Sequence, residues 1–519
     1  MTTGTTTPTT PTPTPGTRIR RTTLAAGALA VLATVLPMAA TPTASAAPAK
    51  PAWCPTVPGH RVDCATMRRP LVDGEPRLGT VDVAHAVVRH TGPGPARGTI
   101  ALNPGGPGET TISRAEQLAQ ALQDLLDDHD LLLLDPRGTG FSGRVPCGVT
   151  DADFRLAPRA GQHEAVARCA EQLGPRARGY TSAATADDID AARARLGAPK
   201  LVLYGLSYGT YLMPVYADRH PERVESMVLS GAYPLAFDPL ARPGAQQISL
   251  TLRRICERAG ACDPDTVVRD LATVAARLRT RPITLDVTVA GARRTYVFTE
   301  DKLANTLYEP ASRGIGIDPT APTLLGDLPA ALHRAAAGDD GPLTDLVRAD
   351  IEHATTEDQA SYLAVTCNDY ARAWDHDAPL PQRRRQYQRA LAAADPADFG
   401  AFSVKGYTEG QTDGADSCLT WPRRGTAQPQ DVDLDLPDVP VLVLSGDLDT
   451  NTPAANSRLA AAQFRDSVFV SVPNTGHIPE MDSTGCAVTV ATTFIRTGGP
   501  GDTSCLAAIP PIAVTPTIR

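Results

Sequence analysis

The residues best suited to chemistry form the pentapeptide Gly205-Leu206-Ser207-Tyr208-Gly209, between an apolar run at 201–204 and a helix-like stretch that reaches Arg219. The apolar run predicts a buried strand. A tight turn from strand to helix forces the serine into a strained backbone conformation, and the glycines let the two segments pass closely. In a chain with 42 glycines this pattern alone is weak evidence. Ser207 is therefore predicted as a nucleophile only together with suitable partners.

An acid and a base follow later in the chain, in the order Ser, Asp, His. The acid candidates lie in the loop Gly446-Asp447-Leu448-Asp449, after an apolar strand pattern. We predict Asp449, at the far end of the loop, as the acid and interpret Asp447 as a solvated or turn-forming carboxylate. His477 is predicted as the base, because it alone among ten histidines follows a late strand, at 467–472, through a glycine.

A glycine-rich loop, Asn103-Pro104-Gly105-Gly106-Pro107-Gly108, follows the strand pattern at 99–102. Acyl transfer places negative charge on a carbonyl oxygen, and two backbone amides must point at it. The amide of Tyr208, the residue after the nucleophile, is one expected donor, and the amide of Gly106 is the other. Pro107 has no N–H to offer. The alternative interpretation of this loop is a plain Pro-Gly turn.

Two other patterns are predicted to be structural. Residues 138–143 match G-x-G-x-x-G, but no helix opens there and no strand ending in an acidic residue follows, so we interpret them as a loop beside 103–108 rather than a dinucleotide site. The triplet Asp375-His376-Asp377 has no second histidine or cysteine at ligand spacing. We therefore expect no metal and no cofactor.

As a set, these motifs resemble the secreted tripeptidyl aminopeptidase family of α/β hydrolases, relatives of the prolyl aminopeptidases. The resemblance covers nearly all of the chain after residue 46 and rests on 103–108, 135–142, 205–209, 446–449, 476–477 and Cys418-Leu419-Thr420-Trp421-Pro422. It implies a serine exopeptidase that acts on peptides with a free amino terminus, with Ser207, Asp449 and His477 as triad. Two departures affect substrate preference: Glu109-Thr110-Thr111 replaces small residues, and Asn103 stands where prolyl aminopeptidases have histidine.

Selection of a free amino terminus requires a carboxylate in a partly desolvated pocket. Glu109, beside the glycine-rich loop, and Asp369, near Cys367, are the candidates, although both are equally consistent with surface residues. Two rival functions stay open. One is an esterase with the same triad, and the other is an inert hydrolase fold that acts as a binding module.

The N-terminal region predicts export. Three arginines (Arg18, Arg20, Arg21), an apolar stretch at 24–36 and Ala44-Ser45-Ala46 are typical of a signal peptide over residues 1–46, with the Sec and twin-arginine routes both open. The apolar stretch is short for a membrane span. We expect a secreted, extracellular monomer without membrane attachment after cleavage. The net charge of −8 and the lack of a basic cluster argue against nucleic acid.

All ten cysteines lie after residue 46, an even number in an exported chain, which favours disulfides over a catalytic thiol. Their spacing suggests five sequence-local pairs. These are Cys54 with Cys64, Cys147 with Cys169, Cys256 with Cys262, Cys367 with Cys418, and Cys486 with Cys505.

Strand and helix patterns alternate from residue 80 to 231 and resume near Val439, which predicts a mostly parallel sheet with helices on both faces. Between them, alanine-rich helices dominate, with one strand pair near 283–298. With the resemblance, this implies an α/β-hydrolase fold with a largely helical cap insertion. We predict a core at 47–233 and 427–519 and a cap at 234–426, which either narrows access to the site or only stabilises the fold.

Overall fold

The computed structural model describes residues 50–145, 147–355, 358–423 and 434–517. The predicted signal peptide, residues 1–46, and the predicted boundary at 426–427 lie outside the described residues. Within them, no helix is long and apolar enough to cross a membrane.

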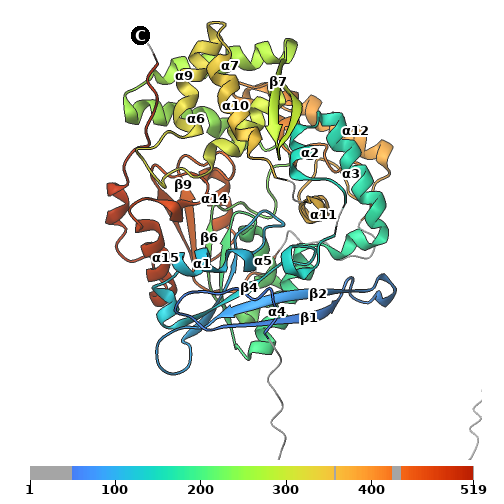
Figure 1. The fold of residues 1–519 in the computed structure, drawn as a ribbon, viewed down its shortest axis with the longest axis vertical. Helices are drawn as coiled ribbons and strands as arrows, with labels where there is room; N and C mark the ends of the chain where they lie inside the picture. Colours follow the sequence, from blue (N-terminus) through green and yellow to red (C-terminus); the bar gives the residue numbers. More distant parts are fainter. Residues whose placement is uncertain (1–49, 146, 356–357, 424–433, 518–519) are drawn as a thin grey trace, which may run out of the picture. The chain divides into compact units, whose positions relative to one another are not determined.

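An eight-stranded sheet, in the order β1-β2-β4-β3-β5-β6-β9-β10, holds the core together (Figure 1). Strands β1 and β2 pair antiparallel, as do β2 and β4, and every other neighbouring pair is parallel. The expected mostly parallel sheet is confirmed, and β1 is a strand that the pattern did not predict. The strands are β1 (Val62–Pro70), β2 (Thr80–Val88), β3 (Gly98–Asn103), β4 (His129–Leu134), β5 (Leu201–Leu206), β6 (Val224–Ser230), β9 (Val441–Gly446) and β10 (Ser467–Val472).

Both faces of the sheet are buried, which explains why its central strands read as continuous apolar runs. Successive strand residues point to opposite faces, so Leu201 and Leu203 join one apolar cluster and Val202 and Tyr204 the other. The first cluster contains α4 (Ser182–Leu196), α5 (Gly209–Arg219) and α14 (Ala454–Ala461). The second contains α1 (Ala115–Ala121) and α15 (Cys486–Thr497). Helices on both faces are therefore confirmed.

The chain leaves the sheet after β6 and returns at β9, and the intervening segment is largely helical, as expected. Capping residues fix the ends of two of its helices. The Asp263 side chain accepts from Thr266 N at the start of α7, and Gly260 ends α6 in the left-handed region. The segment contains α6 (Arg242–Ala259), α7 (Pro264–Thr280), β7 (Ile283–Val289), β8 (Ala292–Phe298), α8 (Glu300–Tyr308), α9 (Leu324–Ala336), α10 (Gly341–Glu352), α11 (Ala360–Asp369), α12 (Leu380–Ala393) and α13 (Val404–Gly410).

Two helices that the sequence did not predict, α2 (Asp151–Leu156) and α3 (Arg159–Leu173), come from the first part of the chain. Their buried residues Phe154, Val166 and Leu173 belong to the same apolar cluster as the inserted helices. The cap is therefore composite, because a segment between β4 and α4 packs with the insertion.

The described residues contain all five disulfides proposed from the sequence, and none of their cysteines is free. Four close loops of 6 to 22 residues, and Cys367–Cys418 closes one of 51. This last bond joins α11 to the segment that follows α13.

Candidate active site

Ser207 occupies the sharp turn between β5 and α5, and its φ of 52° is in the left-handed region that non-glycine residues rarely adopt. The turn is tight on both sides. A Cβ on Gly205 would stand 2.3 Å from Gly209 O, and one on Gly209 would stand 2.5 Å from Asn103 O. Only glycine fits at either position, which explains why both ends of the pentapeptide are glycine.

Ser207, His477 and Asp449 form one connected chain of contacts. His477 Nε2 lies 2.8 Å from Ser207 Oγ, and His477 Nδ1 lies 3.1 Å from Asp449 Oδ2. The three residues follow β5, β10 and β9, which are parallel strands, so the loops at their carboxyl ends meet at one edge of the sheet. This is the geometry that a serine nucleophile, a general base and an orienting acid require.

Asp449 is fully buried and accepts four hydrogen bonds or ionic contacts. Asn451 N and Thr452 N donate to its Oδ1 at 2.8 and 3.0 Å, and the Thr452 hydroxyl donates to its Oδ2, beside His477 Nδ1. Burial acts to raise the pKa of Asp449, but the imidazole of His477 and the donors from Thr452 outweigh it and leave the pKa below its ordinary value. The carboxylate is thus kept ionised where it faces His477.

Asp447, the competing carboxylate, has a different role. It is 8% exposed, forms an ion pair with Arg258 of α6, and accepts Asn474 N at 2.9 Å. Its carboxylate fastens the loop before His477 to the cap and does not contact the imidazole. The expectation of a solvated or turn-forming carboxylate was wrong, because the Arg258 guanidinium covers Asp447 and the backbone donor that it accepts, Asn474 N, lies in another loop.

The glycine-rich loop lies against the nucleophile turn. A Cβ on Gly105, whose φ is 108°, would meet Leu206 O and Ser207 Cβ at 2.8 Å each. Gly105 N donates to Asn103 Oδ1 at 3.1 Å, so the Asn103 side chain braces the loop by accepting from the Gly105 amide. Gly106 lines the same cavity as Ser207. The amides of Gly106 and Tyr208 as oxyanion donors stay predictions.

Asp135 links residues 110–112, which follow this loop, to the glycine-rich segment at 138–143. Its Oδ1 accepts Thr111 N at 2.8 Å and Ile112 N at 2.9 Å, and its Oδ2 accepts Phe141 N at 2.9 Å. Ser142 turns back to donate to Asp135 O at 2.6 Å. Residues 138–143 thus form a structural loop beside residues 110–112, just after the glycine-rich loop, and do not begin an α-helix.

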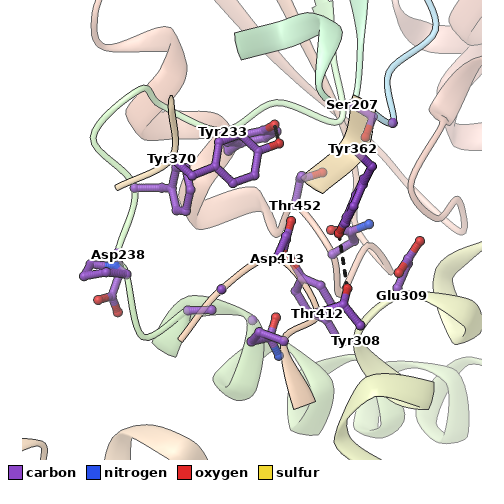
Figure 2. Close-up of a pocket in the computed structure, with 18 residues that line it drawn as sticks. Ser207, Tyr233, Asp238, Tyr308, Glu309, Tyr362, Tyr370, Thr412, Asp413 and Thr452 are labelled. Atoms are coloured by element: carbon purple, nitrogen blue, oxygen red, sulfur yellow. Dashed lines mark hydrogen bonds between the residues drawn. The ribbon is translucent and has the colours of Figure 1, made fainter. Parts of the chain in front are cut away.

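A small cavity, partly open to solvent, adjoins Ser207 (Figure 2). The core contributes Gly106, Ser207, Asn451 and Thr452, and most of the remaining lining comes from the inserted segment. Four tyrosines line it: Tyr233, Tyr308, Tyr362 and Tyr370.

Three acidic side chains line the same cavity, Asp238, Glu309 and Asp413, and Figure 2 shows them spread across it. Asp238 pairs with Arg242 at 2.7 Å, and Glu309 pairs with Arg313. None of the three was predicted, because nothing in their local sequence distinguishes them from surface acids. Asp413 lies five residues before Cys418, and this proximity to a predicted disulfide was the only sequence feature that could have indicated a role for it.

The two acids predicted from the sequence lie elsewhere. Glu109 pairs with exposed Arg114 and lines a second, wider cavity. Asp369 is buried at the end of α11, where its Oδ2 accepts Ser182 N at 2.6 Å and Ser182 Oγ at 2.7 Å. It is not among the lining residues of the cavity beside Ser207. Asp369 does lie near the site, as its proximity to Cys367 suggested, but its carboxylate accepts hydrogen bonds from Ser182 of the core.

The second cavity extends from the other side of the glycine-rich loop and shares Gly106, Glu309, Tyr362 and Thr412 with the first. Its lining is strongly charged. Arg155 pairs with Asp350 at 2.7 Å, and Glu309 and Arg313 border it. The two cavities thus meet where the nucleophile and the predicted oxyanion loop lie.

Across the described ranges there is no group of three or more histidine, cysteine, aspartate or glutamate side chains that could hold a metal ion. The triplet at 375–377 lies within these ranges.

Comparison with known proteins defines the class. Residues 98–271 match a family described as alpha/beta hydrolase fold, and residues 405–505 match one described as TAP-like protein. The first match contains Ser207, and the second contains Asp449 and His477. The chain has an α/β-hydrolase fold, and its region with the acid and the base is similar to TAP-like proteins.

Individual relatives agree with this class. Serine protease Hip1 of Mycobacterium tuberculosis is 34% identical over 174 residues, 30% of this chain and 34% of that protein. Tripeptidyl aminopeptidase of Streptomyces lividans is 30% identical over 187 residues, 32% and 35% of the two chains. Carboxylesterase B of M. tuberculosis is 28% identical over 204 residues, 36% and 38%. The matches span about a third of the length of these relatives.

Proposed function

We propose that the protein is a serine aminopeptidase, which releases short amino-terminal fragments from peptides through an acyl-enzyme. The observation that carries the proposal is the chain of contacts from Ser207 Oγ through His477 to buried Asp449. The match of the acid-bearing and base-bearing region to TAP-like proteins supports the aminopeptidase type. The tripeptidyl aminopeptidase relative supports the same type.

In this mechanism His477 Nε2 takes the proton of Ser207 as the hydroxyl oxygen attacks the peptide carbonyl. Asp449 holds Nδ1 and stabilises the imidazolium. The amides of Gly106 and Tyr208 receive the oxyanion. Collapse of the intermediate breaks the C–N bond, and His477 returns the proton to the leaving amine. Water, activated by His477, then hydrolyses the acyl-enzyme and releases the amino-terminal fragment.

The two cavities support an assignment of the substrate's halves. The cap-lined cavity beside Ser207 suits a short amino-terminal fragment, because its space is limited and its lining carries acidic groups. The wider, charged cavity beyond Gly106 suits the leaving peptide, whose side chains vary. A cleft roofed by the cap would admit peptides and exclude folded proteins.

Two measurements test this function. A fluorophosphonate should label the wild-type protein and fail to label Ser207→Ala. A free-amine tripeptide p-nitroanilide should be cleaved with release of the intact tripeptide, as seen by mass spectrometry. No labelling would favour the inert binding module, and cleavage inside longer peptides without regard to the terminus would refute the aminopeptidase type.

An esterase is the second candidate, because Carboxylesterase B is among the relatives. The same triad cleaves esters, so the two functions differ in substrate binding. Parallel kcat/KM values for the peptide p-nitroanilide and a short acyl p-nitrophenyl ester distinguish them. A peptide preference supports the aminopeptidase, and activity confined to esters supports the esterase.

We also propose that the protein acts outside the cell as a monomer. Five disulfides are typical of oxidising compartments. Amino-terminal sequencing of protein from the culture medium should begin at Ala47. Protein retained in the cell with residues 1–46 attached would refute export, and light scattering would reveal an oligomer.

A further inference from the structure

We propose that Asp413 binds the amino-terminal ammonium group of the substrate within the tyrosine-lined cavity. The inference rests on the proposed aminopeptidase function and names the group that would make it depend on a charged terminus. Asp413 and Ser207 line one cavity, so a bound fragment can reach both (Figure 2). Neither acid predicted from the sequence lines that cavity.

Asp413 is singled out by the pairing of its neighbours. Asp238 is matched by Arg242, and Glu309 is matched by Arg313. Among the described residues, no lysine, arginine or histidine nitrogen forms an ion pair with the Asp413 carboxylate. Burial raises the pKa of Asp413, and the charge of Arg372 acts against that rise without forming an ion pair with the carboxylate. A substrate ammonium would supply the missing ion-pair partner.

Arg372 lies close to Asp413 but is engaged with other groups. Its Nη1 donates to the backbone oxygen of Asp413 at 2.5 Å, and its Nη2 donates to Thr366 O at 2.6 Å and to Cys418 Sγ at 3.0 Å. The guanidinium therefore holds the main chain of residues 411–414, called the Asp413 segment, and the Asp413 carboxylate lines the cavity.

The Asp413 segment is fixed from several directions. Arg159 of α3 donates to Gln411 O at 3.0 Å and to Gly414 O at 3.3 Å, and Cys367–Cys418 ties its far end to α11. A carboxylate on such a braced segment is preorganised, so little entropy is lost when an ammonium binds. The cap therefore builds the site, and α3, a helix that the sequence did not predict, contributes to it through Arg159.

Aromatic rings complete an environment suited to a cation. Tyr233 and Tyr370 share a hydroxyl–hydroxyl hydrogen bond of 2.6 Å with ring centroids 6.0 Å apart, and Phe237 packs edge-on to Tyr370 at 5.1 Å. All three line the cavity with Asp413. Ring faces attract an ammonium ion, whereas a neutral acetylated terminus would leave the carboxylate desolvated without a partner.

The experiment compares three substrates that differ only at the terminus: a free-amine tripeptide p-nitroanilide, its Nα-acetyl form and its des-amino form. Wild type should prefer the free amine over the des-amino substrate in kcat/KM. Asp413→Asn should lower kcat/KM for the free-amine substrate by about 30-fold or more, the loss expected when one partner of a buried charge pair is removed. The des-amino rate should change by less than about 3-fold.

Matched variants and a labelling assay isolate the cause. Asp238→Asn removes a cavity carboxylate that already has a partner, and it should keep the preference for the free amine. Asp413→Glu retains the charge and should retain part of the preference. The fluorophosphonate labelling rate should be the same in Asp413→Asn and wild type, which shows that the triad is intact.

The possible outcomes distinguish a failure of the Asp413 assignment from a failure of the proposed aminopeptidase function. Preference retained in Asp413→Asn, or lost equally in Asp238→Asn, overturns the role of Asp413 while the hydrolase stands. No labelling and no peptide cleavage by wild type overturns the proposed function. If Asp413→Asn does not fold, competition on wild type decides: n-butylammonium should inhibit cleavage and n-butanol should not, and equal effects overturn the inference.

Discussion

Replacement of Asp449 by asparagine should abolish most of the turnover for a reason that the contacts define. The Oδ1 of Asp449 accepts two backbone N–H groups, from Asn451 and Thr452, so the oxygen of an asparagine must occupy that position. Its NH₂ group must then face His477 Nδ1. The imidazole would carry its proton on Nε2 and could no longer accept the proton of Ser207.

The magnitude follows from the loss of the correct tautomer and of the charge that stabilises the imidazolium. The same exchange in a serine protease triad lowers kcat by about 10⁴-fold, or about 5 kcal/mol. Asp449 is fully buried, so water cannot substitute for the lost charge. We expect a fall of about that size in kcat for the peptide p-nitroanilide, with the protein still folded.

Asp447→Asn is the matched control, two residues away in the same loop. The asparagine oxygen can still accept Asn474 N, and the ion pair with Arg258 is weakened, at a cost to stability of about 1–3 kcal/mol. We expect kcat within about 10-fold of wild type. Turnover and thermal unfolding of both variants test this directly. If folded Asp447→Asn is the more impaired enzyme, Asp449 is not the acid.

Three further predictions concern the loop, the cap and pH. Gly105→Ala should lower kcat by roughly 10²–10³-fold, because its Cβ would collide with Leu206 O and displace the neighbouring Gly106 amide, the predicted oxyanion donor. Steady-state kinetics with KM unchanged would confirm this prediction, and wild-type kcat would contradict it. Removal of Cys367–Cys418 by paired serines should destabilise the fold by about 4 kcal/mol for its 51-residue loop, as measured by urea unfolding, and a change under about 1 kcal/mol would count against the bond. Burial acts to raise the pKa of Asp416, but hydrogen bonds and charges from His163 and Arg159 lower it from 3.8 to about 2. The ionised carboxylate therefore stabilises the folded state by about 2 kcal/mol above pH 4, and this stabilisation is lost as the pH falls toward 2. Asp416→Asn should flatten the fall in Tm over that range, and an unchanged slope would refute the assignment.

Much of the core could be predicted from the sequence because its signals are local. Strand β10 has the bounds, 467–472, that the apolar pattern predicts. The nucleophile turn depends on Gly205, Ser207 and Gly209, all within five residues, so its pentapeptide is recognisable without tertiary information. The five disulfides were accessible for the same reason, since their partners lie near each other in sequence.

The missed features depend on contacts between distant segments. Helix α3 has little amphipathic pattern, and its membership in the cap follows from packing against residues far along the chain. Asp369 and Asp413 look alike in sequence, yet one carboxylate is satisfied by Ser182 and the other opens into a cavity. Burial of Asp447 likewise requires Arg258 of α6, about 190 positions earlier.

The pairing of β6 with β9 has a consequence for how the cap could be exchanged. Ser230 lies opposite Leu444 in this parallel pair, so the chain leaves and rejoins the sheet on neighbouring strands. A foreign cap grafted between these strands would leave the register of the sheet unaltered. Because α2 and α3 pack with the insertion, and Arg159 of α3 braces the Asp413 segment, a transplant confined to the insertion would import specificity residues without their support. A working chimera would need residues 147–173 from the same donor.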